Sequence, residues 1–449
     1  MSQPYAKRDN VFLAWYPACV NAEEAPATWA PKSSAFYVHI PFCTAVCDYC
    51  GFAVERAKGA AIPRYLDALR LEIERYAAAG RLAGHRFDCG HFGGGTPSVL
   101  SGEQLTAVIA QLRDVAVVSD DAEITVEVNP ISFTEDKAHA YRAAGVNRLS
   151  CGIQSFDEAT LRVLGRPHRV RDAERVIELA HAAEFESFSL DVMYGVPGQT
   201  VADLERDLQR AVETGATHLS CFRLELIPFT ALKLRESAGL LPPLLSEAEV
   251  NEMSLLVSER LAEHGYAEYG AFNYALPGHE SVHNAIAFGA PQREYVGFGN
   301  SAFSYFGGSV YSNHASLKAY EEAVFAGRDP ISLAHRVTAR EEMSRYFVLG
   351  LKMLRVERAP FGERFGFAPE EIFGEPLERL QAAGLLERRD DAYVLTSAGR
   401  VYVNNVCKEF YVGESYGVGQ HQEFVPTLTP EQILYFAGQR ERRLAEAHG

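Results

Sequence analysis

Short apolar stretches alternate with longer amphipathic stretches over the first half of the chain, starting at about residue 35. Apolar runs bounded by turn residues are typical of buried strands, and apolar residues spaced three and four apart are typical of helices. The predicted strands are residues 36–40, 87–92, 123–129, 148–153, 187–194 and 217–226. The helices predicted between them are residues 64–79, 102–116, 134–144, 171–183 and 201–214. This alternation predicts parallel βα units of the α/β class, arranged as a partial (β/α)6 barrel of the TIM type.

At about residue 311 the pattern changes to helices joined by short turns. We expect helices at residues 341–354, 369–383 and 399–410, with a hairpin at residues 385–395 that turns at Asp390 and Asp391. Helices next to a hairpin predict a mainly helical, winged-helix-like C-terminal domain. The predicted organisation is an irregular, proline-containing arm at residues 1–34, a barrel with its connector at 35–310, and a C-terminal domain with its tail at 311–449.

The loop that follows the first predicted strand holds three cysteines within eight residues, Cys43, Cys47 and Cys50. Thiolates at these spacings converge from one irregular loop onto the irons of a four-iron cluster, which usually has four cysteine ligands. Three ligands leave one iron open, and an open position is typical of catalytic metal sites. A zinc site with His39 as the fourth ligand is the alternative. On a strand that ends at Pro41, His39 would point sideways while the cysteines lie beyond the strand end, which favours the cluster.

Polar and glycine residues stand at the ends of the next two predicted strands. In βα barrels the chemistry collects at the C-terminal ends of the strands. Gly93, Gly94, Gly95 and Thr96 follow the second strand, and glycines let the backbone approach a ligand closely. Glu127 lies near the end of the third strand, where two-residue periodicity places it on the face opposite the apolar residues. We therefore expect a ligand site at this end of the barrel.

Charge and composition narrow the class of partner. The chain has 43 Lys and Arg against 59 Asp and Glu, a formal net charge of -16, which argues against a nucleic-acid surface because phosphate binding needs clustered basic side chains. The sequence has no run of about 18 apolar residues and no signal-peptide pattern, so we expect no membrane association. Five of the eight cysteines are scattered and do not suggest a disulfide framework. We expect a cytoplasmic protein that acts on a small-molecule substrate.

The cysteine loop, with Tyr49 before the last cysteine and Tyr-x-His-Ile-Pro-Phe before the first, resembles that of the radical S-adenosylmethionine (SAM) superfamily. The resemblance extends from about residue 35 to residue 410, and specifically to the branch of oxygen-independent coproporphyrinogen III oxidase, or HemN. It implies a [4Fe-4S] cluster on Cys43, Cys47 and Cys50 that reduces SAM to methionine and a 5'-deoxyadenosyl radical. It also implies an electron donor such as flavodoxin or ferredoxin.

The same resemblance implies a set of SAM-binding residues. The residues implied to contact SAM are Gly93, Gly94, Gly95, Thr96, Glu127, Gln154, Arg166 and Asp191. The glycines and Thr96 resemble the superfamily's GGGTP motif, which contacts the SAM amino group, and the fork of donors on Arg166 suits a carboxylate. Tyr37 and Tyr194 are implied as contacts of a second SAM molecule.

One residue distinguishes the reactions known in this branch. The oxidase has a further cysteine in a Cys-Gly-Cys pattern, whereas Cys50 and Gly51 are followed here by Phe52. Cys-Gly-Phe resembles the class C radical SAM methylases, the cyclopropane-forming enzymes of natural-product pathways and the anaerobic heme-degrading methyltransferases. We therefore expect an enzyme that uses a second SAM as methyl or methylene donor to an sp2 carbon of a small molecule. The alternatives are oxidative decarboxylation by a coproporphyrinogen oxidase, and an anaerobic heme-degrading methyltransferase or a heme-binding chaperone.

The heme-chaperone alternative depends on His283 and Asn284. In the related heme chaperone a His-Asn-x-x-Tyr-Trp pattern is associated with heme. Here the residues after Asn284 are Ala-Ile-Ala-Phe, so the aromatic pair is absent. This departure argues against a heme role.

Overall fold

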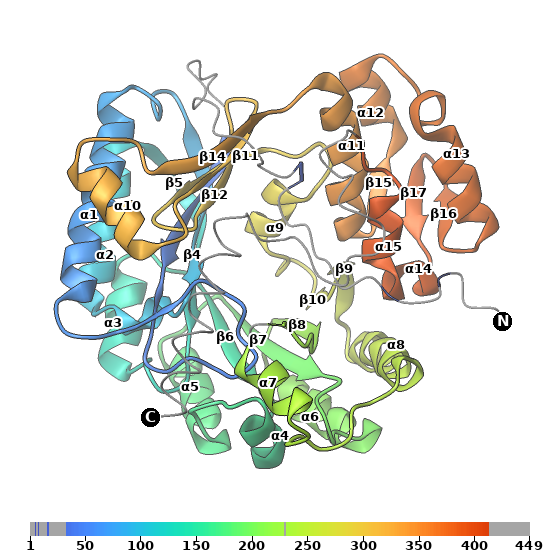
Figure 1. Cartoon of the computed structure of the whole chain (residues 1–449), viewed down its shortest axis with the longest axis horizontal. Coiled ribbons are helices and arrows are strands. Elements are labelled where there is room, and N and C mark those ends of the chain that lie inside the picture. The colour runs from blue at the N-terminus through green and yellow to red at the C-terminus, as the bar shows by residue number, and fades with distance from the viewer. Residues whose placement is uncertain (1–4, 6–7, 9–15, 18–32, 229, 413–449) are drawn as a thin grey trace.

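A 12-stranded sheet forms the centre of the computed structural model, which describes residues 5, 8, 16–17, 33–228 and 230–412 (Figure 1). Neighbouring parallel strands run through the middle of this sheet in chain order. They are β1 (Ser33–Ile40), β4 (Arg86–Gly94), β5 (Val117–Val128), β6 (Arg148–Gln154), β7 (Ser187–Tyr194) and β8 (His218–Arg223). All six predicted strands are present, and the α/β barrel fold is confirmed.

Helices cover the outer face of the curved sheet (Figure 1). Those of the βα units are α1 (Ala61–Ala78), α2 (Gly102–Val115), α3 (Glu135–Ala143), α4 (Glu158–Val163), α5 (Val170–Ala182) and α6 (Val201–Glu213), followed by α7 (Ala231–Ser237) and α8 (Glu247–Glu263). Apolar side chains at alternate strand positions, such as Val38, Ile40 and Val126, are buried in the core that these helices share with the sheet. The intervening positions face the barrel interior. A capping box of Ser101 and Gln104 starts α2.

The sheet continues beyond the six-stranded part on both sides. β11 (Glu294–Phe298) pairs parallel with β1, and the antiparallel strands β12 (Phe303–Phe306), β13 (Ser309–Asn313) and β14 (Ile331–Arg336) follow, with α10 (Leu317–Phe325) between the last two. On the other side are β10 (Asn273–Ala275) and β9 (Ala267–Gly270). The short helix α9 (Val282–Ala287) contacts β1, β4 and β11 and lies near the centre of the view in Figure 1. Because the sheet extends to residue 336, we propose that the C-terminal domain begins near residue 337 and not at 311.

The C-terminal domain has its own apolar core. Its elements are α11 (Ala339–Gly350), β15 (Arg355–Glu357), α12 (Arg358–Phe365), α13 (Pro369–Ala382), β16 (Leu386–Arg389), β17 (Ala392–Leu395), α14 (Ser397–Val401) and α15 (Val403–Lys408). The predicted hairpin is present as β16 and β17, and β15 joins it to complete a small sheet. Tyr16 of the N-terminal arm is buried in this core, where Ser344 Oγ lies 2.8 Å from its hydroxyl. The tail after residue 412 lies outside the described residues.

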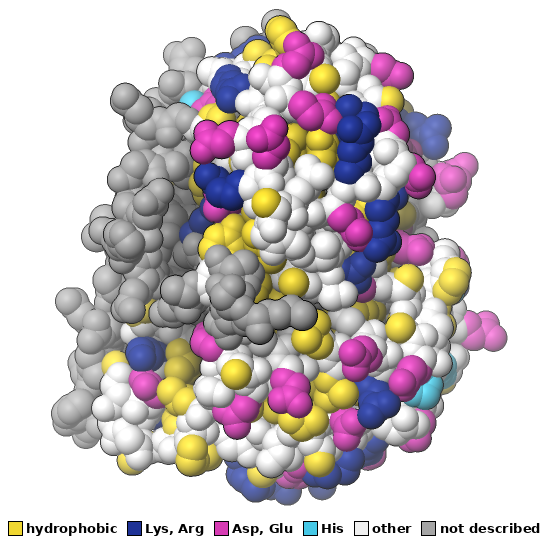
Figure 2. All heavy atoms as spheres, turned by 90° about the vertical axis from the view of Figure 1, so that its right-hand side faces the viewer, with side chains coloured by type: hydrophobic (Ala, Val, Ile, Leu, Met, Phe, Trp, Pro, Cys, Tyr) yellow, Lys and Arg dark blue, Asp and Glu magenta, His cyan; other side chains and the backbone are white. Residues whose placement is uncertain are grey.

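Acidic and basic side chains are interspersed on the surface of the C-terminal domain side of the molecule, as Figure 2 shows. Among the described helices, none combines the length and apolarity needed to cross a membrane.

A buried carboxylate ties α1 to the far edge of the sheet. Glu72 is 0% exposed; its Oε2 accepts hydrogen bonds from Gly299 N–H at 2.8 Å and the Tyr320 hydroxyl at 2.6 Å, and its Oε1 from Asn313 Nδ2 at 2.7 Å. Burial raises the pKa of Glu72 to about 7 despite these three donors. The carboxylate thereby fixes the turn after β11, directly beside β1.

We expect Glu72→Gln to be less stable than the wild type by about 2 kcal/mol at pH 5, because the amide group leaves one buried donor unsatisfied. In the wild type the folded carboxyl keeps its proton up to about pH 7, whereas the unfolded one ionises near 4.5. The stability that this group contributes is full below pH 4.5 and is lost as the pH rises through 7, so the difference should shrink towards pH 8. Urea unfolding at pH 5 and at pH 8 measures the difference in the free energy of unfolding between the wild type and Glu72→Gln. Glu74→Gln is the control, because Glu74 is exposed on the same helix. If the two proteins differ in stability by the same amount at both pH values, the folded Glu72 carboxyl does not keep its proton at pH 5.

Candidate functional site

The cysteine loop leaves the carboxyl end of β1. Cys43 ends the two-residue strand β2 (Phe42–Cys43), which pairs with β3 (Glu55–Arg56), and Cys47 and Cys50 lie in the irregular segment between them. Cys43 is 9% exposed, Cys47 is 8% exposed and Cys50 is half-buried. All seven cysteines of the described residues are free thiols.

The loop is held in place by contacts around Asp48. Asp48 N–H donates to the Leu164 carbonyl at 3.2 Å, and the Asp48 carbonyl accepts from Leu232 N–H at 2.8 Å. The Asp48 carboxylate pairs with Arg235 NH1 at 2.8 Å. Gly165 allows this close packing, since a Cβ atom there would lie 2.3 Å from Asp48 Cγ and its φ of +63° disfavours other residues. The loop is therefore anchored by protein contacts on the far side of the barrel mouth.

Two of the three sulfurs accept hydrogen bonds from the protein. Thr96 Oγ1 lies 3.3 Å from Cys43 Sγ, and Arg166 NH1 lies 3.1 Å from Cys47 Sγ. Burial raises the pKa of Cys43 to about 11 and that of Cys50 to about 12. Both groups are thus thiols without metal, and loading a metal there must displace their protons. A triad of thiols on one anchored loop, with donors directed at the sulfurs, fits an iron–sulfur cluster.

The zinc alternative required His39 as a fourth ligand. In the part of the chain that the structure describes, no three Cys, His, Asp or Glu side chains meet in an arrangement for a single metal ion. His39 faces the barrel interior, with Nδ1 3.1 Å from the Tyr37 hydroxyl. A cluster contains several irons, so its cysteine ligands do not need to converge on one point. The geometry therefore favours the cluster.

Most of the other predicted site residues meet around two glycines. A Cβ atom on Gly93 would lie 2.7 Å from Glu127 Oε1 and 3.1 Å from the Tyr37 ring. A Cβ atom on Gly152, in β6, would lie 2.9 Å from the Gln154 amide nitrogen. The same atom would lie 3.7 Å from Arg166 NH2 and 3.8 Å from Asp191 Oδ2. Gly94, with φ of +109°, donates its N–H to Glu127 Oε2 at 3.2 Å. The glycines thus leave a cradle between the polar side chains that a ligand backbone or carboxylate can enter.

The electrostatics of this cradle favour neutral forms. Burial raises the pKa of Asp191 to about 7, and the nearby Glu127 adds to the rise. Burial also lowers the pKa of His39 to about 4. Asp191 therefore binds a proton more readily than an exposed carboxylate does.

Tyr194 is a predicted site residue that lies on the other face of the sheet. It is buried in the core between the sheet and the outer helices, where its hydroxyl interacts with Ser254 of α8. Asp191 and Tyr194 are three residues apart on β7, so two-residue periodicity places them on opposite faces of the sheet. The structure does not bring Tyr194 to the cradle.

Three histidines lie near the site, and of these only His283 was considered in the sequence. His91 Nε2 lies 3.0 Å from Glu127 Oε1, and its ring stacks on Tyr37 with the centroids 5.9 Å apart. The ring centroid of His283, from α9, lies 4.9 Å from that of His91. His168 contacts Arg166. His91 could have been found from periodicity, because it is two residues before Gly93 on the same strand face.

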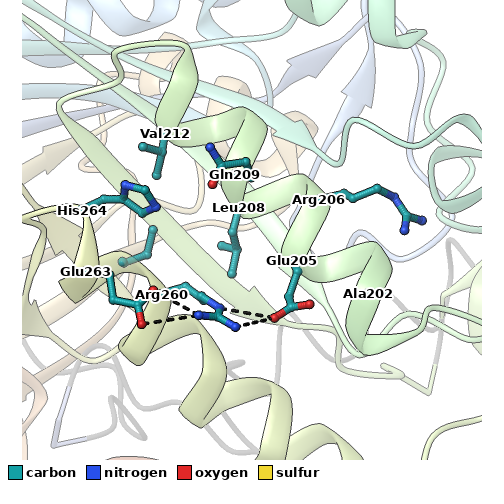
Figure 3. A pocket seen from close by; sticks show the side chains of 10 residues that line it. Ala202, Glu205, Arg206, Leu208, Gln209, Val212, Arg260, Glu263 and His264 are labelled. Atoms are coloured by element: carbon teal, nitrogen blue, oxygen red, sulfur yellow. Dashed lines mark hydrogen bonds and ion pairs between the residues drawn. The ribbon is translucent and has the colours of Figure 1, made fainter.

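A separate hollow of about 480 Å³ lies between α6 and α8, on the outer helical layer (Figure 3). Arg260 pairs there with Glu205 at 2.8 Å and with Glu263 at 3.1 Å. None of the residues that line it belongs to the cysteine loop or the cradle, so we do not connect it with the site.

Comparison with known proteins gives consistent matches. The radical SAM superfamily model matches residues 37–211, and the HemN C-terminal domain model matches residues 337–402. The chain is 35% identical to the heme chaperone HemW of Bacillus subtilis over 83% of this chain and 98% of that protein. It is 30% identical to HemW of Escherichia coli over 84% of this chain and 97% of that protein. Among solved structures, coproporphyrinogen III oxidase (HemN) from Escherichia coli matches with a TM-score of 0.76 and 27% identity, over 86% of this chain and 91% of that one.

These relatives correct the expected reaction. Proteins at 30 to 35% identity over most of the chain are named heme chaperones, and none of them is named a methyltransferase or cyclopropane-forming enzyme. The expectation of carbon transfer from a second SAM to a natural-product substrate is therefore wrong. The cluster and SAM contacts do not distinguish these classes, since the whole superfamily shares them.

The superfamily implies a [4Fe-4S] cluster, SAM and a reductant for the cluster, while the number of SAM molecules stays a prediction. The anchored thiols, the glycine cradle and the two domain matches agree on one assignment. The chain belongs to the family of the heme chaperone HemW, within the HemN-like branch of the radical SAM superfamily.

Proposed function

We propose that this chain binds heme and delivers it to other proteins, with a [4Fe-4S] cluster on Cys43, Cys47 and Cys50 and SAM in the neighbouring cradle. The observation that carries the proposal is the 35% identity over 98% of the length of a protein named heme chaperone. Phe52, in the place of the oxidase's further cysteine, separates the chain from that enzyme; its side chain is 67% exposed beside the cluster loop. When bound, the cluster supplies one electron to SAM.

We propose His283 as the residue that ligates the heme iron. Burial and then the neighbouring His91 lower the pKa of His283 to about 3, so its imidazole is neutral, which is the form that binds metals. Its Nδ1 atom is buried and has no hydrogen-bond partner among the described residues. The neutral ring keeps a lone pair on one nitrogen, and no hydrogen bond commits Nδ1 to carrying the proton, so Nδ1 can present that lone pair to a metal. A proximal histidine is a common heme ligand.

The surroundings of His283 compensate for the missing aromatic pair of the sequence pattern. The His283 ring contacts Tyr295 at 6.3 Å and Tyr37 at 6.4 Å between centroids. Asn284 Nδ2 donates to the Tyr269 hydroxyl at 3.1 Å and so fixes the start of α9. Aromatic side chains from other strands thus stand around the His-Asn pair, and the absence of Tyr-Trp does not count against heme.

The proposed function requires a reductant, a heme supply and a protein that receives the heme. We propose flavodoxin or ferredoxin as the reductant, because a [4Fe-4S] cluster accepts single electrons at low potential. The small-molecule ligand is heme, and a heme-requiring protein receives it. We also propose a cytoplasmic location, since free cysteines suit a reducing compartment.

Titration of hemin into the anaerobically purified chain, followed by its Soret band, tests the proposal. The wild type should show saturable binding, and His283→Ala should bind at least tenfold more weakly. His279→Ala, four residues earlier in the same connector, is the matched control and should bind as the wild type does. Hemin that produces no saturable Soret change in the wild type would overturn the heme role.

Coproporphyrinogen and methyl-labelled SAM provide a second arm of this experiment. The reconstituted chain with reductant should release no carbon dioxide from coproporphyrinogen and should transfer no labelled carbon. Release of carbon dioxide would contradict the chaperone role and favour the oxidase.

A further inference from the structure

Arg166 lies between the cluster loop and the strand β6. Its NH1 donates to Cys47 Sγ at 3.1 Å, its Nε donates to His168 Nδ1 at 3.2 Å, and its NH2 donates to the Gly152 carbonyl. All three guanidinium nitrogens thus donate hydrogen bonds to the protein, and one of these bonds goes to a proposed cluster ligand. The contact of Arg166 to the SAM carboxylate that the resemblance implies stays a prediction.

His168 fixes the orientation of this guanidinium. It is 2% exposed, and its Nε2 lies 3.0 Å from the Ile153 carbonyl. A carbonyl only accepts, so Nε2 carries the hydrogen and Nδ1 is left as an acceptor for Arg166 Nε. Burial, followed by the charge of Arg166, lowers the pKa of His168 to about 3, which keeps the ring in this neutral form. Because its second nitrogen is bonded to the backbone of β6, the ring holds Arg166 against Cys47.

We propose that Arg166, positioned by His168, donates a charge-assisted hydrogen bond to the Cys47 thiolate of the cluster and makes the cluster easier to reduce. Reduction adds one electron from the external reductant to the cluster, and no protein bond forms or breaks. The added negative charge spreads over the sulfurs, so a cation and an N–H donor at one sulfur stabilise the reduced state more than the oxidised state. The inference depends on the cluster assignment and not on the heme role.

Thr96 provides an internal comparison. Its hydroxyl lies 3.3 Å from Cys43 Sγ, but it carries no charge. The stability of the reduced cluster relative to the oxidised cluster should therefore depend more on Arg166 than on Thr96.

Anaerobic redox titration of the reconstituted chain, with the reduced cluster measured by electron paramagnetic resonance, tests the proposal. Arg166→Gln should lower the ratio of reduced to oxidised cluster about tenfold at a fixed potential, which is a midpoint about 59 mV more negative for one electron. His168→Leu should shift the midpoint in the same direction, whereas His168→Gln, which can accept from Arg166 and donate to Ile153, should restore it. Arg162→Gln removes an exposed charge from the preceding helix and should leave the midpoint unchanged.

A wild-type midpoint in Arg166→Gln with full iron content would overturn the proposal, and so would an equal shift in Arg162→Gln. If Arg166→Gln does not retain its irons, the midpoints of His168→Leu and His168→Gln are compared with each other. Different midpoints in these two variants support the proposal, and equal midpoints overturn it. Hemin titration of the same variants reports separately on the heme role, since a shifted midpoint stands whether or not heme binds.

Discussion

Replacing Cys47 by alanine should leave a folded chain that no longer holds its iron–sulfur cluster. The loop offers three thiols, and a four-iron cluster with two protein ligands exposes two irons to solvent and is lost. The substitution also removes the acceptor of Arg166 NH1, so a guanidinium is left facing an apolar methyl group. We expect the iron and sulfide content after anaerobic reconstitution to fall at least tenfold, measured chemically and by absorption near 400 nm.

Cys407→Ala is the matched control for this loss. Cys407 is buried in the C-terminal core, away from the loop, and should reconstitute like the wild type. Wild-type iron content in Cys47→Ala would overturn the cluster assignment. Hemin binding should persist in Cys47→Ala if His283 is the heme ligand, because the two sites share no residue.

The barrel could be predicted because its signals are local. Each strand carries alternating or continuous apolar residues between turns, and β7 was predicted with both of its ends, residues 187 and 194. The cysteine loop was equally visible, since its three cysteines lie within eight residues of one another. Such features depend on spacing along the chain and not on how distant elements pack.

The neighbours of the site could not be predicted in this way. His283 meets His91 across a sequence separation of nearly two hundred residues, and only the insertion of α9 beside β1 and β4 brings them together. The hydrogen bond from Arg166 to Cys47 likewise joins residues 119 positions apart in the sequence. Tyr194 is different, because two-residue periodicity from Asp191 already placed it on the outer face.

The reaction could not be read from the site residues at all. Cluster thiols and a SAM cradle serve methylases, oxidases and chaperones alike, so Cys-Gly-Phe alone did not separate the methylases from HemW. Sequence identity to the HemW proteins, over nearly the full length of those relatives, separated the two classes. Fold-level resemblance fixes the chemistry that a site can hold, whereas the function depends on the residues around it.

Gly95→Ala should damage both the fold and the cluster. A Cβ atom at Gly95 would lie 2.8 Å from the Phe42 oxygen, 2.8 Å from the Pro41 carbonyl carbon and 2.9 Å from the Ile40 oxygen. All three are backbone atoms of the segment that leads into Cys43, so no side-chain rotation relieves the contact. We expect a loss of about 3 kcal/mol in the free energy of unfolding, at the upper end for overpacking.

The same substitution should reduce cluster content because the contact cannot relax without moving Cys43. Gly95 N–H donates to the Ile40 carbonyl and Thr96 N–H to the Phe42 carbonyl, both at 2.8 Å, so separating the two segments breaks two backbone bonds. It also withdraws the Thr96 hydroxyl from Cys43 Sγ. Urea unfolding and iron content measure the two effects, with Gly374→Ala as the control, since a Cβ there meets nothing within 4 Å. A Gly95→Ala chain with wild-type stability and iron would show that this backbone crossing does not position the cluster loop.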